Sequence, residues 1–180
     1  MATPVGHALA GVAWGALVGG RRPWFGPWRD VMFFAALAMA PDLDFLPGLV
    51  IGRPEAFHHG VSHSLGFALL FGGLMAWWGA RRGAPWRWGL LGAGMYFLQV
   101  LLDWLTLDTS PPRGVPLWWP WSGHYFMAEP WLFDDVRRRP LAWATLWHDI
   151  KAAGWEVVVL GPAAGVALWW RGRGLRAAKE

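Results

Sequence analysis

The chain of 180 residues has the length of a single domain, and it contains no cysteine, which excludes disulfides and thiolate metal sites. Its mean hydropathy of +0.27, its 55% of hydrophobic residues and its 17 tryptophans are typical of a membrane protein and not of a water-soluble one. The formal net charge of +4 comes mostly from short basic clusters between apolar runs, and this distribution favours membrane topology signals over nucleic-acid binding.

Five apolar segments predict membrane helices, at about residues 4–19, 31–40, 62–80, 86–107 and 155–170. A straight span needs roughly 20 apolar residues. The third and fourth segments meet this length, the first and fifth have 16 residues each, and the second is long enough only if residues 41–50 re-enter the membrane or cap it. We therefore expect an all-α fold, a polytopic membrane helical bundle of four to five short helices. No basic stretch precedes the first segment, so we expect no cleaved signal peptide.

Residues 108–154 are predicted to form a sizeable extramembrane region. Its first part contains a turn at 110–114 and a tryptophan-rich segment at 117–121 that we expect to lie in the membrane interface. Residues 140–154 place Leu141, Ala144, Trp147 and Ile150 at helical spacing, which predicts an amphipathic helix. The predicted bundle therefore has an interfacial loop and helix on its outer face.

The distribution of charge predicts the orientation in the membrane. If the segments alternate across the bilayer, one side receives Arg29 and the basic clusters at 21–22, 81–87 and 171–179 and has a net charge of +8, whereas the other side has a net charge of −4. Cytoplasmic loops contain the excess of Lys and Arg in membrane proteins. We therefore expect the N-terminus outside and the C-terminus in the cytoplasm.

Seven ionisable residues then fall on the outward side: His7, Asp42, Asp44, His58, His59, His63 and Asp103. The charge count used none of the histidines, and an ionisable residue at membrane depth is costly enough to indicate a function. Imidazole and carboxylate groups without sulfur suit zinc or a similar divalent ion, and two such ions about 3.5–4 Å apart can hold a phosphate ester. We expect His58 before the third helix and His63 in its first turn, and we expect Gln99 and Asp103 on one face of the fourth helix.

Each of these residues also has a simpler interpretation. A single histidine near the boundary can be an interfacial polar residue, Pro41-Asp42-Leu43-Asp44 can cap a helix, and Asp103 can pair with Arg113. These explanations account for the residues one at a time but not for seven of them on one side. A metal site is therefore favoured, while the tryptophan-rich stretches are interpreted as interfacial anchors.

Five short motifs occur in the order expected of a known family. They are Gly6-His7-Ala8, Pro41-Asp42-Leu43-Asp44, the HHGVSHS segment from His58 to Ser64, the LLDWLT segment from Leu101 to Thr106, and the RGVPLWWPWS segment from Arg113 to Ser122. Through them, residues 1–125 resemble the YdjM family of inner-membrane-associated proteins, whose expected activity is metal-dependent hydrolysis. That family is distantly similar to zinc-dependent phospholipase C, an all-helical enzyme that cleaves phosphoesters at clustered zinc ions. The resemblance thus implies a phosphoester or phospholipid substrate.

The resemblance assigns metal binding to His7, Asp42 or Asp44, His58, His63 and Asp103, with one or two divalent ions, and zinc is the expected metal. The chain departs from the family's pattern at three positions, where His59 stands for arginine, Ser62 for threonine and Gln99 for histidine. Glutamine is a weak neutral ligand, and His124, His148 and Glu156 are candidate substitutes further along the chain. The expected organisation is one membrane-embedded domain over residues 1–180, with a metal-site core (1–125), an interfacial segment (126–154) and a last membrane helix with a basic tail (155–180).

The expected function is a membrane-bound metal-dependent hydrolase at the outer face of the cytoplasmic (inner) membrane, with Asp44 or His59 as general base. Its partners are membrane lipids and a lipid or phosphoester substrate, and no nucleic acid is expected. The alternative is a non-catalytic membrane protein that binds a partner or a structural metal. A lipid phosphatase is disfavoured because only Arg22-Pro23 and the segment from Trp121 to His124 resemble its motifs, while its upstream lysine and its later Ser-Arg…His element are absent. A transporter is disfavoured because the polar residues stop on one side. The oligomeric state stays open, since Gly11 and Gly15 allow close helix contact within one chain or between two.

Overall fold

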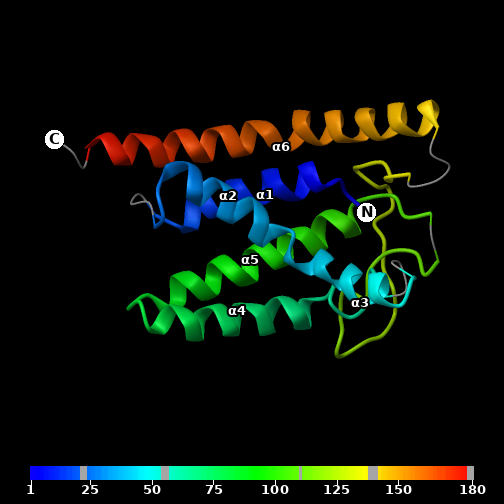
Figure 1. The fold of residues 1–180 in the computed structure, drawn as a ribbon, viewed down its shortest axis with the longest axis horizontal. Coiled ribbons are helices and arrows are strands. Elements are labelled where there is room, and N and C mark those ends of the chain that lie inside the picture. The colour runs from blue at the N-terminus through cyan, green and yellow to red at the C-terminus, as the bar shows by residue number, and fades with distance from the viewer. Residues whose placement is uncertain (21–23, 54–56, 110, 138–141, 178–180) are drawn as a thin grey trace.

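The computed structural model describes residues 1–180 except 21–23, 54–56, 110, 138–141 and 178–180 (Figure 1). The described residues form helices and no strand, which confirms the all-α class. The elements are α1 (Pro4–Val18), α2 (Pro27–Ala38), the 3-10 helix η1 (Ala40–Asp44), α3 (Phe45–Val50), α4 (Leu65–Ala80), α5 (Pro85–Trp104) and α6 (Trp143–Ala177).

Local capping explains where two of these helices begin. The hydroxyl oxygen of Thr3 accepts hydrogen bonds from the backbone N–H groups of Val5 and Gly6, and Pro4 takes the first position of α1. Ser64 caps α4 in the same way by accepting the N–H of Phe67. Because Ser64 is the cap, His63 lies just before α4, and the expectation that it belongs to the first turn was wrong by a few residues.

A bend separates α2 from α3. The helical segments Pro27–Ala38 and Ala40–Val50 meet at 51°. Pro41 stands in the first turn of η1, where its missing N–H leaves no hydrogen bond unmade. Asp42 and Asp44 are therefore placed on a short, tight turn between two apolar helices, in the segment expected to re-enter or cap the membrane.

The described helices pack through small residues and three clusters of buried apolar side chains, of which one is shared by four helices. Figure 1 shows α4 and α5 as antiparallel neighbours, with α1 between α2, α5 and α6. Side chains of α1, α2, α4 and α5 form the shared cluster, made of Val12, Phe34, Met75, Trp88, Leu91 and Met95. A Cβ atom at Gly15 would lie 2.2 Å from the ring of Phe34, so glycine is what allows α2 to approach. The close contact that Gly11 and Gly15 permit is thus made within the chain.

Helix α6 differs from the expected pattern. Residues 143–154, expected as part of a separate interfacial helix, continue without a break into the expected last membrane helix, and Pro162 lies inside α6 without ending it. The separation was wrong; the start of the expected helix, at 140 and 141, lies outside the described residues. Only 22% of the most apolar 18-residue window of α6 is buried, so this helix is not the core helix of a water-soluble bundle.

The membrane-crossing capacity of the described helices is unequal. The stretch Trp143–Arg173 is long and apolar enough to cross a membrane by itself, and the bent pair Pro27–Ala38 and Ala40–Val50 passes the same test as one broken span. Helices α1 and α4 are apolar but shorter. In Figure 1 the N-terminus and α3 lie at one end of the bundle, and the α4–α5 turn and the end of α6 lie at the other.

Candidate metal centre

The seven predicted residues meet at the end of the bundle that holds the N-terminus. His7 comes from α1, Asp42 and Asp44 from η1, and Asp103 from the last turn of α5. His58, His59 and His63 come from the loop before α4. This loop is tightly turned: its N–H groups at Gly60 and His63 bond to the carbonyls of Phe57 and Gly60, and His59 adopts a left-handed φ of 57°. Segments far apart in sequence thus converge as predicted.

His63 is the centre of the cluster. Its Nε2 lies 3.4 Å from Oδ1 of Asp42 and 3.6 Å from Oδ2 of Asp103, and its side chain is fully buried. A tetrahedral zinc ion with ligands at about 2.0–2.1 Å separates its ligand atoms by roughly 3.3 Å. The spacing of Asp42, His63 and Asp103 therefore fits a divalent ion with small side-chain adjustments.

The second nitrogen of His63 is oriented by a carboxylate. Its Nδ1 lies 3.1 Å from Oδ2 of Asp44, which also accepts a hydrogen bond from the hydroxyl of Ser62 at 2.8 Å. The other oxygen of Asp44 lies 2.9 Å from Nδ1 of His58. Metal-binding histidines commonly donate their second N–H to a carboxylate, which fixes the ring and its tautomer. Asp44 makes contacts typical of such an orienting group.

In the part of the chain that the structure describes, the buried polar side-chain atoms that make no hydrogen bond lie in or beside this cluster. Among the described residues, six buried side-chain nitrogen or oxygen atoms make no hydrogen bond: both ring nitrogens of His7, Nε2 of His59, Nε2 of His63, Oε1 of Gln99 and Oδ2 of Asp103. Leaving a buried polar group unpaired costs about 1–3 kcal/mol. Such a concentration fits a bound ion, because these atoms are of the types that ligate one.

His7 and Asp103 form the innermost contact. Nε2 of His7 lies 3.5 Å from Oδ1 of Asp103, and both side chains are fully buried. The same oxygen accepts the backbone N–H of Ala2 at 3.0 Å. Oδ1 is thus engaged by the N-terminal segment, and Oδ2 is left facing His63. Asp103 does not pair with Arg113, which is exposed.

Gln99 supports Asp42. Its amide nitrogen donates to Oδ1 of Asp42 at 2.7 Å, while Gln99 and Asp103 are both about 1% exposed on the inner face of α5. The predicted shared face is therefore confirmed. Gln99 thus gives Asp42 a donor and leaves one oxygen, Oε1, without a hydrogen bond.

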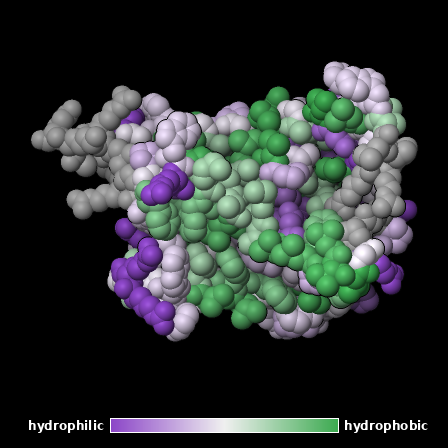
Figure 2. All heavy atoms as spheres, in the orientation of Figure 1, coloured by the Kyte–Doolittle hydropathy of each residue, from purple (hydrophilic) through white to green (hydrophobic). Residues whose placement is uncertain are grey.

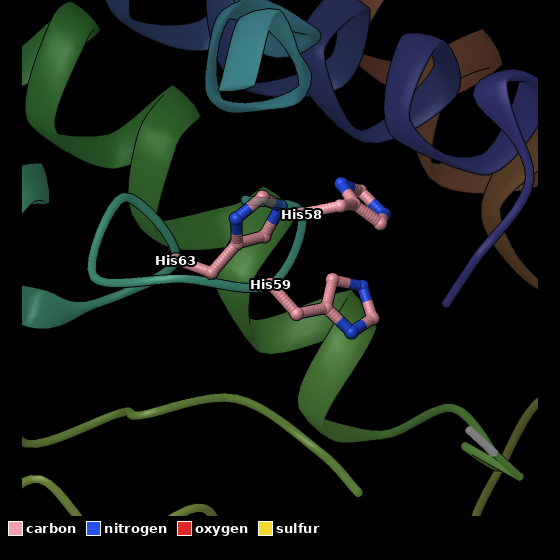
Figure 3. Close-up of side chains that lie close together, drawn as sticks. All are labelled: His58, His59 and His63. Atoms are coloured by element: carbon pink, nitrogen blue, oxygen red, sulfur yellow. The ribbon is translucent and has the colours of Figure 1, made fainter. Parts of the chain in front are cut away.

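The three loop histidines form a second group of possible ligands. Figure 3 shows their side chains gathered together, and the ring centroids of His58, His59 and His63 are 4.3 to 5.3 Å apart. One ring nitrogen from each can lie within 4.8 Å of the others, as in the group of Asp42, His63 and Asp103. The ring of His58 is also stacked on Phe45 at 3.8 Å. Since His63 belongs to both groups, they adjoin.

The loop histidines differ in proton affinity. Burial lowers the pKa of His58, and the neighbouring His59 and His63 lower it further against the opposing hydrogen bond to Asp44. Burial also disfavours a charged His63, but its interactions with Asp42 and Asp44 outweigh this and raise its pKa to about 9. In the absence of an ion, therefore, a proton is held on His63 in preference to His58.

Sequence reasoning missed the partner of His59. Nδ1 of His59 lies 3.3 Å from Oδ2 of Asp108, which also accepts the backbone N–H of Gly114 at 2.9 Å. Gly114 has a φ of +89°, and a Cβ there would lie 2.2 Å from the carbonyl oxygen of Phe126. The motif that begins at Arg113-Gly114 contains the glycine that contacts Asp108, so part of this arrangement was visible in the sequence. The spacing of the motif, however, did not indicate Asp108 as a partner of His59.

The three downstream substitutes do not enter the cluster as ligands. His124 is exposed, and Nε2 of His148 lies 3.1 Å from Asp135. Glu156 is buried against the first turn of α1. A groove of about 600 Å³, lined in part by Trp24, Arg87 and Trp170, contains none of the seven predicted residues.

Comparison with known proteins gives one result. The model of the family described as YdjM inner membrane protein matches residues 1–174, so it extends beyond the five motifs and includes α6 up to Gly174. No curated protein and no solved structure gives a significant match.

Proposed function

The chain belongs to the YdjM inner membrane protein family. We propose that it is a multi-pass, metal-dependent hydrolase. Its substrate would be a phosphoester or lipid-type molecule at the outer face of the inner membrane. One observation carries the proposal: of the six buried side-chain atoms of the described chain that make no hydrogen bond, five belong to the histidine–carboxylate cluster, and the sixth is Oε1 of Gln99, whose amide donates to Asp42. Chance burial would scatter such atoms, whereas a metal site gathers them.

The arrangement of charge supports the proposed topology. Arg81 and Arg82 end α4 at the opposite end of the bundle from the cluster, and Arg171 and Arg173 lie near the end of α6 at that same opposite end. Basic residues mark the cytoplasmic side, so the cluster and the N-terminus would face outward. Helices α1 and α4 would then cross by packing against the longer α5 and α6. Arg21 and Arg22 lie outside the described residues.

Four residues would hold the ion. His63 offers Nε2, Asp103 offers Oδ2, Asp42 offers a carboxylate oxygen, and His7 offers a ring nitrogen beside Asp103. Asp44 would keep the ring of His63 in place through Nδ1. A zinc ion supplies Lewis-acid polarisation of an ester oxygen and of water when it is bound. His58 and His59 are the residues that would bind a second ion, since Nε2 of His63 faces the first ion and its Nδ1 faces Asp44.

The charge of the cluster favours an anionic substrate only if divalent ions are present. Asp42, Asp44 and Asp103 bring three negative charges, and among the described residues no Lys or Arg forms an ion pair with them. A phosphoester would be repelled by the carboxylates alone. Two divalent ions would reverse the sign of the site, which is why we expect a phosphoester hydrolase to hold two.

His59 is better suited than Asp44 to accept a proton. Both oxygens of Asp44 are engaged with His58, His63 and Ser62. His59 presents an unpaired Nε2, while Asp108 faces its Nδ1 and would stabilise the charged ring. A histidine backed by a carboxylate is a common general base. When a single ion is bound, His59 would therefore take a proton from water at Nε2, and Asp108 would hold the ring in the required orientation; with a second ion bound, the same Nε2 would be a ligand instead.

An apolar surface adjoins the cluster. Leu46, Leu49 and Val50 of α3 have exposed side chains, and 87% of Val50 is accessible. Figure 2 shows hydrophobic side chains over much of this face, including its lower right part, where α3 lies. Exposed apolar patches of this kind mark contacts with membranes or apolar ligands. A lipid could reach the cluster sideways from the bilayer along α3, which favours a lipid phosphoester.

The alternative function is a membrane protein with a structural metal. It is favoured by the complete burial of the side chains of His7, His63 and Asp103, because closed sites are typical of structural ions. The two functions differ in whether the protein turns over a substrate. They also differ in whether removal of the ion by a chelator unfolds the protein. Removing a structural ion would unfold the protein, whereas removing a catalytic ion would leave the helices folded.

The test is metal content per chain, measured by mass spectrometry on detergent-purified protein. We expect about one or two zinc ions in the wild type and their loss in His63→Ala and Asp103→Ala, with hydrolysis of phosphoester or phospholipid substrates only in the loaded wild type. Asp134→Ala, which removes an exposed carboxylate, is the matched control and should keep its metal. A folded wild type that contains no metal and takes up none from added zinc would contradict the proposal.

A further inference from the structure

Glu156 is a fully buried carboxylate on α6, the helix that contributes none of the seven cluster residues. Its Oε1 accepts the backbone N–H of Thr3 at 2.7 Å. Its Oε2 accepts the backbone N–H of Gly6 at 3.0 Å and the hydroxyl of Thr3. A carboxylate in a lipid-exposed helix is costly, so this one is retained against a penalty.

These three hydrogen bonds hold the first turn of α1. The N–H groups there have no partner within the helix, and a negative charge is favourable at the positive end of the helix dipole. The fit is close, because a Cβ atom at Gly6 would lie 2.5 Å from Oε2 of Glu156. Only glycine at position 6 therefore lets the carboxylate reach the turn.

The residues held by Glu156 are the neighbours of the two that touch Asp103. Ala2 precedes Thr3 and donates its N–H to Oδ1 of Asp103 at 3.0 Å. His7 follows Gly6, and its Nε2 lies 3.5 Å from the same oxygen. Fixing Thr3 and Gly6 thus fixes both groups that engage Oδ1, and Oδ2 is left turned toward His63.

We infer that Glu156 is a positioning residue of the metal centre, which acts through the first turn of α1 to set the places of His7 and Asp103. The inference rests on the proposed function, and it adds α6 to a site otherwise built from α1, η1, the histidine loop and α5. Glu156 is not itself a ligand, because its two oxygens accept three hydrogen bonds from Thr3 and Gly6.

The rival explanation is that Glu156 only ties α6 to α1. Asp30 provides the matched control, since it is a buried carboxylate that also binds α6, through Arg171, and lies in α2 away from the cluster. If Glu156 merely stabilised the packing, Asp30→Asn and Glu156→Gln would affect metal binding alike. A positioning role predicts that the two variants differ.

The experiment measures zinc affinity by competition with a chromophoric chelator, and the visible spectrum of the cobalt(II)-loaded protein, for full-length wild type, Glu156→Gln and Asp30→Asn in detergent. We expect Glu156→Gln to bind zinc about 10- to 100-fold more weakly and to show an altered cobalt spectrum, as is usual when a group that orients metal ligands is removed. Asp30→Asn should match the wild type in both. Gly6→Ala keeps the charge of Glu156 but displaces it, and should weaken zinc binding in the same way.

The other possible results distinguish a failure of the positioning role of Glu156 from a failure of the proposed metal-dependent function. Wild-type zinc affinity and spectrum in Glu156→Gln, or an equal loss in Asp30→Asn, would overturn the positioning role while leaving the metal centre intact. A wild type that binds neither zinc nor cobalt would overturn the proposed function and this inference with it. If Glu156→Gln does not fold, Gly6→Ala decides by the same criteria.

Discussion

The two ends of the bundle both bury charged side chains, but they treat them differently. At the end that holds the cluster, which we term the histidine end (His7, Asp42, Asp44, His58, His59, His63, Gln99 and Asp103), six buried side-chain atoms of the described chain make no hydrogen bond. At the opposite end, the arginine end (Asp30, Phe34 and Arg171), Oδ1 of Asp30 accepts the N–H of Phe25, and Oδ2 accepts the N–H of Trp24 and the guanidinium of Arg171. Arg171 also lies over the ring of Phe34.

This difference distinguishes a structural network from a binding site. A buried ion pair whose remaining lone pairs are satisfied has no need of a ligand, and its value lies in joining elements. Three of the six atoms lie 3.4–3.6 Å from a histidine or carboxylate partner, and the other three, at about 1–3 kcal/mol each, are already a large penalty for a chain of this size. The arginine end therefore joins α2 to α6, while the histidine end is arranged for a ligand that compensates its unpaired atoms.

The largest effect, on the free energy of unfolding, is expected from removing the cation of the arginine end. Arg171→Met would leave the carboxylate of Asp30 buried without its cation, and we expect a loss of about 3–5 kcal/mol in the free energy of unfolding. Zinc content per folded chain should not change. Chemical unfolding in detergent, with metal analysis of the folded fraction, measures both quantities.

Arg173→Met is the matched control for this variant, because Arg173 is exposed on the same helix and its removal should change stability by no more than about 0.5 kcal/mol. The double variant Asp30→Leu/Arg171→Met should regain only part of the lost stability, since it leaves no unpaired charge but removes the acceptor of the N–H groups of Trp24 and Phe25. If Arg171→Met lost zinc without losing stability, the arginine end would contribute to metal binding. The distinction between a structural arginine end and a metal-binding histidine end would then be wrong.

The histidine end was more predictable from sequence than the arginine end. Histidine and aspartate in apolar segments stand out because burying them is costly, and charge alternation assigned all seven to one side before their contacts were known. Asp30 and Arg171 were interpreted only as topology signals, because nothing in a one-dimensional pattern indicates that residues 141 positions apart meet.

Three features of the fold needed three-dimensional information. Residues 140–154 and 155–170 were predicted as separate helices because the first has an amphipathic pattern and the second an apolar one, but α6 runs through both and packs against α1. Asp108 was missed because its role depends on a turn closed by Gly114. Glu156 was considered only as a substitute ligand, since the sequence could not show that it reaches α1 and not the cluster itself.

A smaller effect is expected from Asp44, and it tests whether the histidine end is organised around His63. Asparagine in place of Asp44 keeps the size of the side chain but loses one acceptor and the charge that face His58, His63 and Ser62. We expect zinc to bind about 10- to 100-fold more weakly, or roughly 1.4–2.7 kcal/mol. Competition titration with a chelator measures this.

The control for Asp44→Asn is Asp134→Asn, an exposed carboxylate whose loss should leave the zinc affinity unchanged. A complete loss of zinc in Asp44→Asn would instead make Asp44 a ligand, as one of the sequence-based assignments has it. An unchanged affinity would mean that the tautomer of His63 is set without Asp44, and that the short contact between them has no part in metal binding.

The smallest effect on zinc affinity is expected from substitution of Gln99. Its hydrogen bond to Asp42 can be compared with the hydrogen bonds to Asp30 at the arginine end. Gln99→Leu removes the amide that donates to Asp42, but the side chain of Asp42 is 20% exposed, so water can replace that donor. At the arginine end no such replacement is open to Asp30, which is 1% exposed. We therefore expect zinc affinity to fall by less than tenfold, about 1 kcal/mol, in the same titration.

Gln99→His keeps a nitrogen that can donate to Asp42 or ligate, and should bind zinc at least as tightly as the wild type. A loss of more than 100-fold in Gln99→Leu would make the unpaired Oε1 a ligand, and the carboxylates and histidines alone would then be an incomplete description of the site.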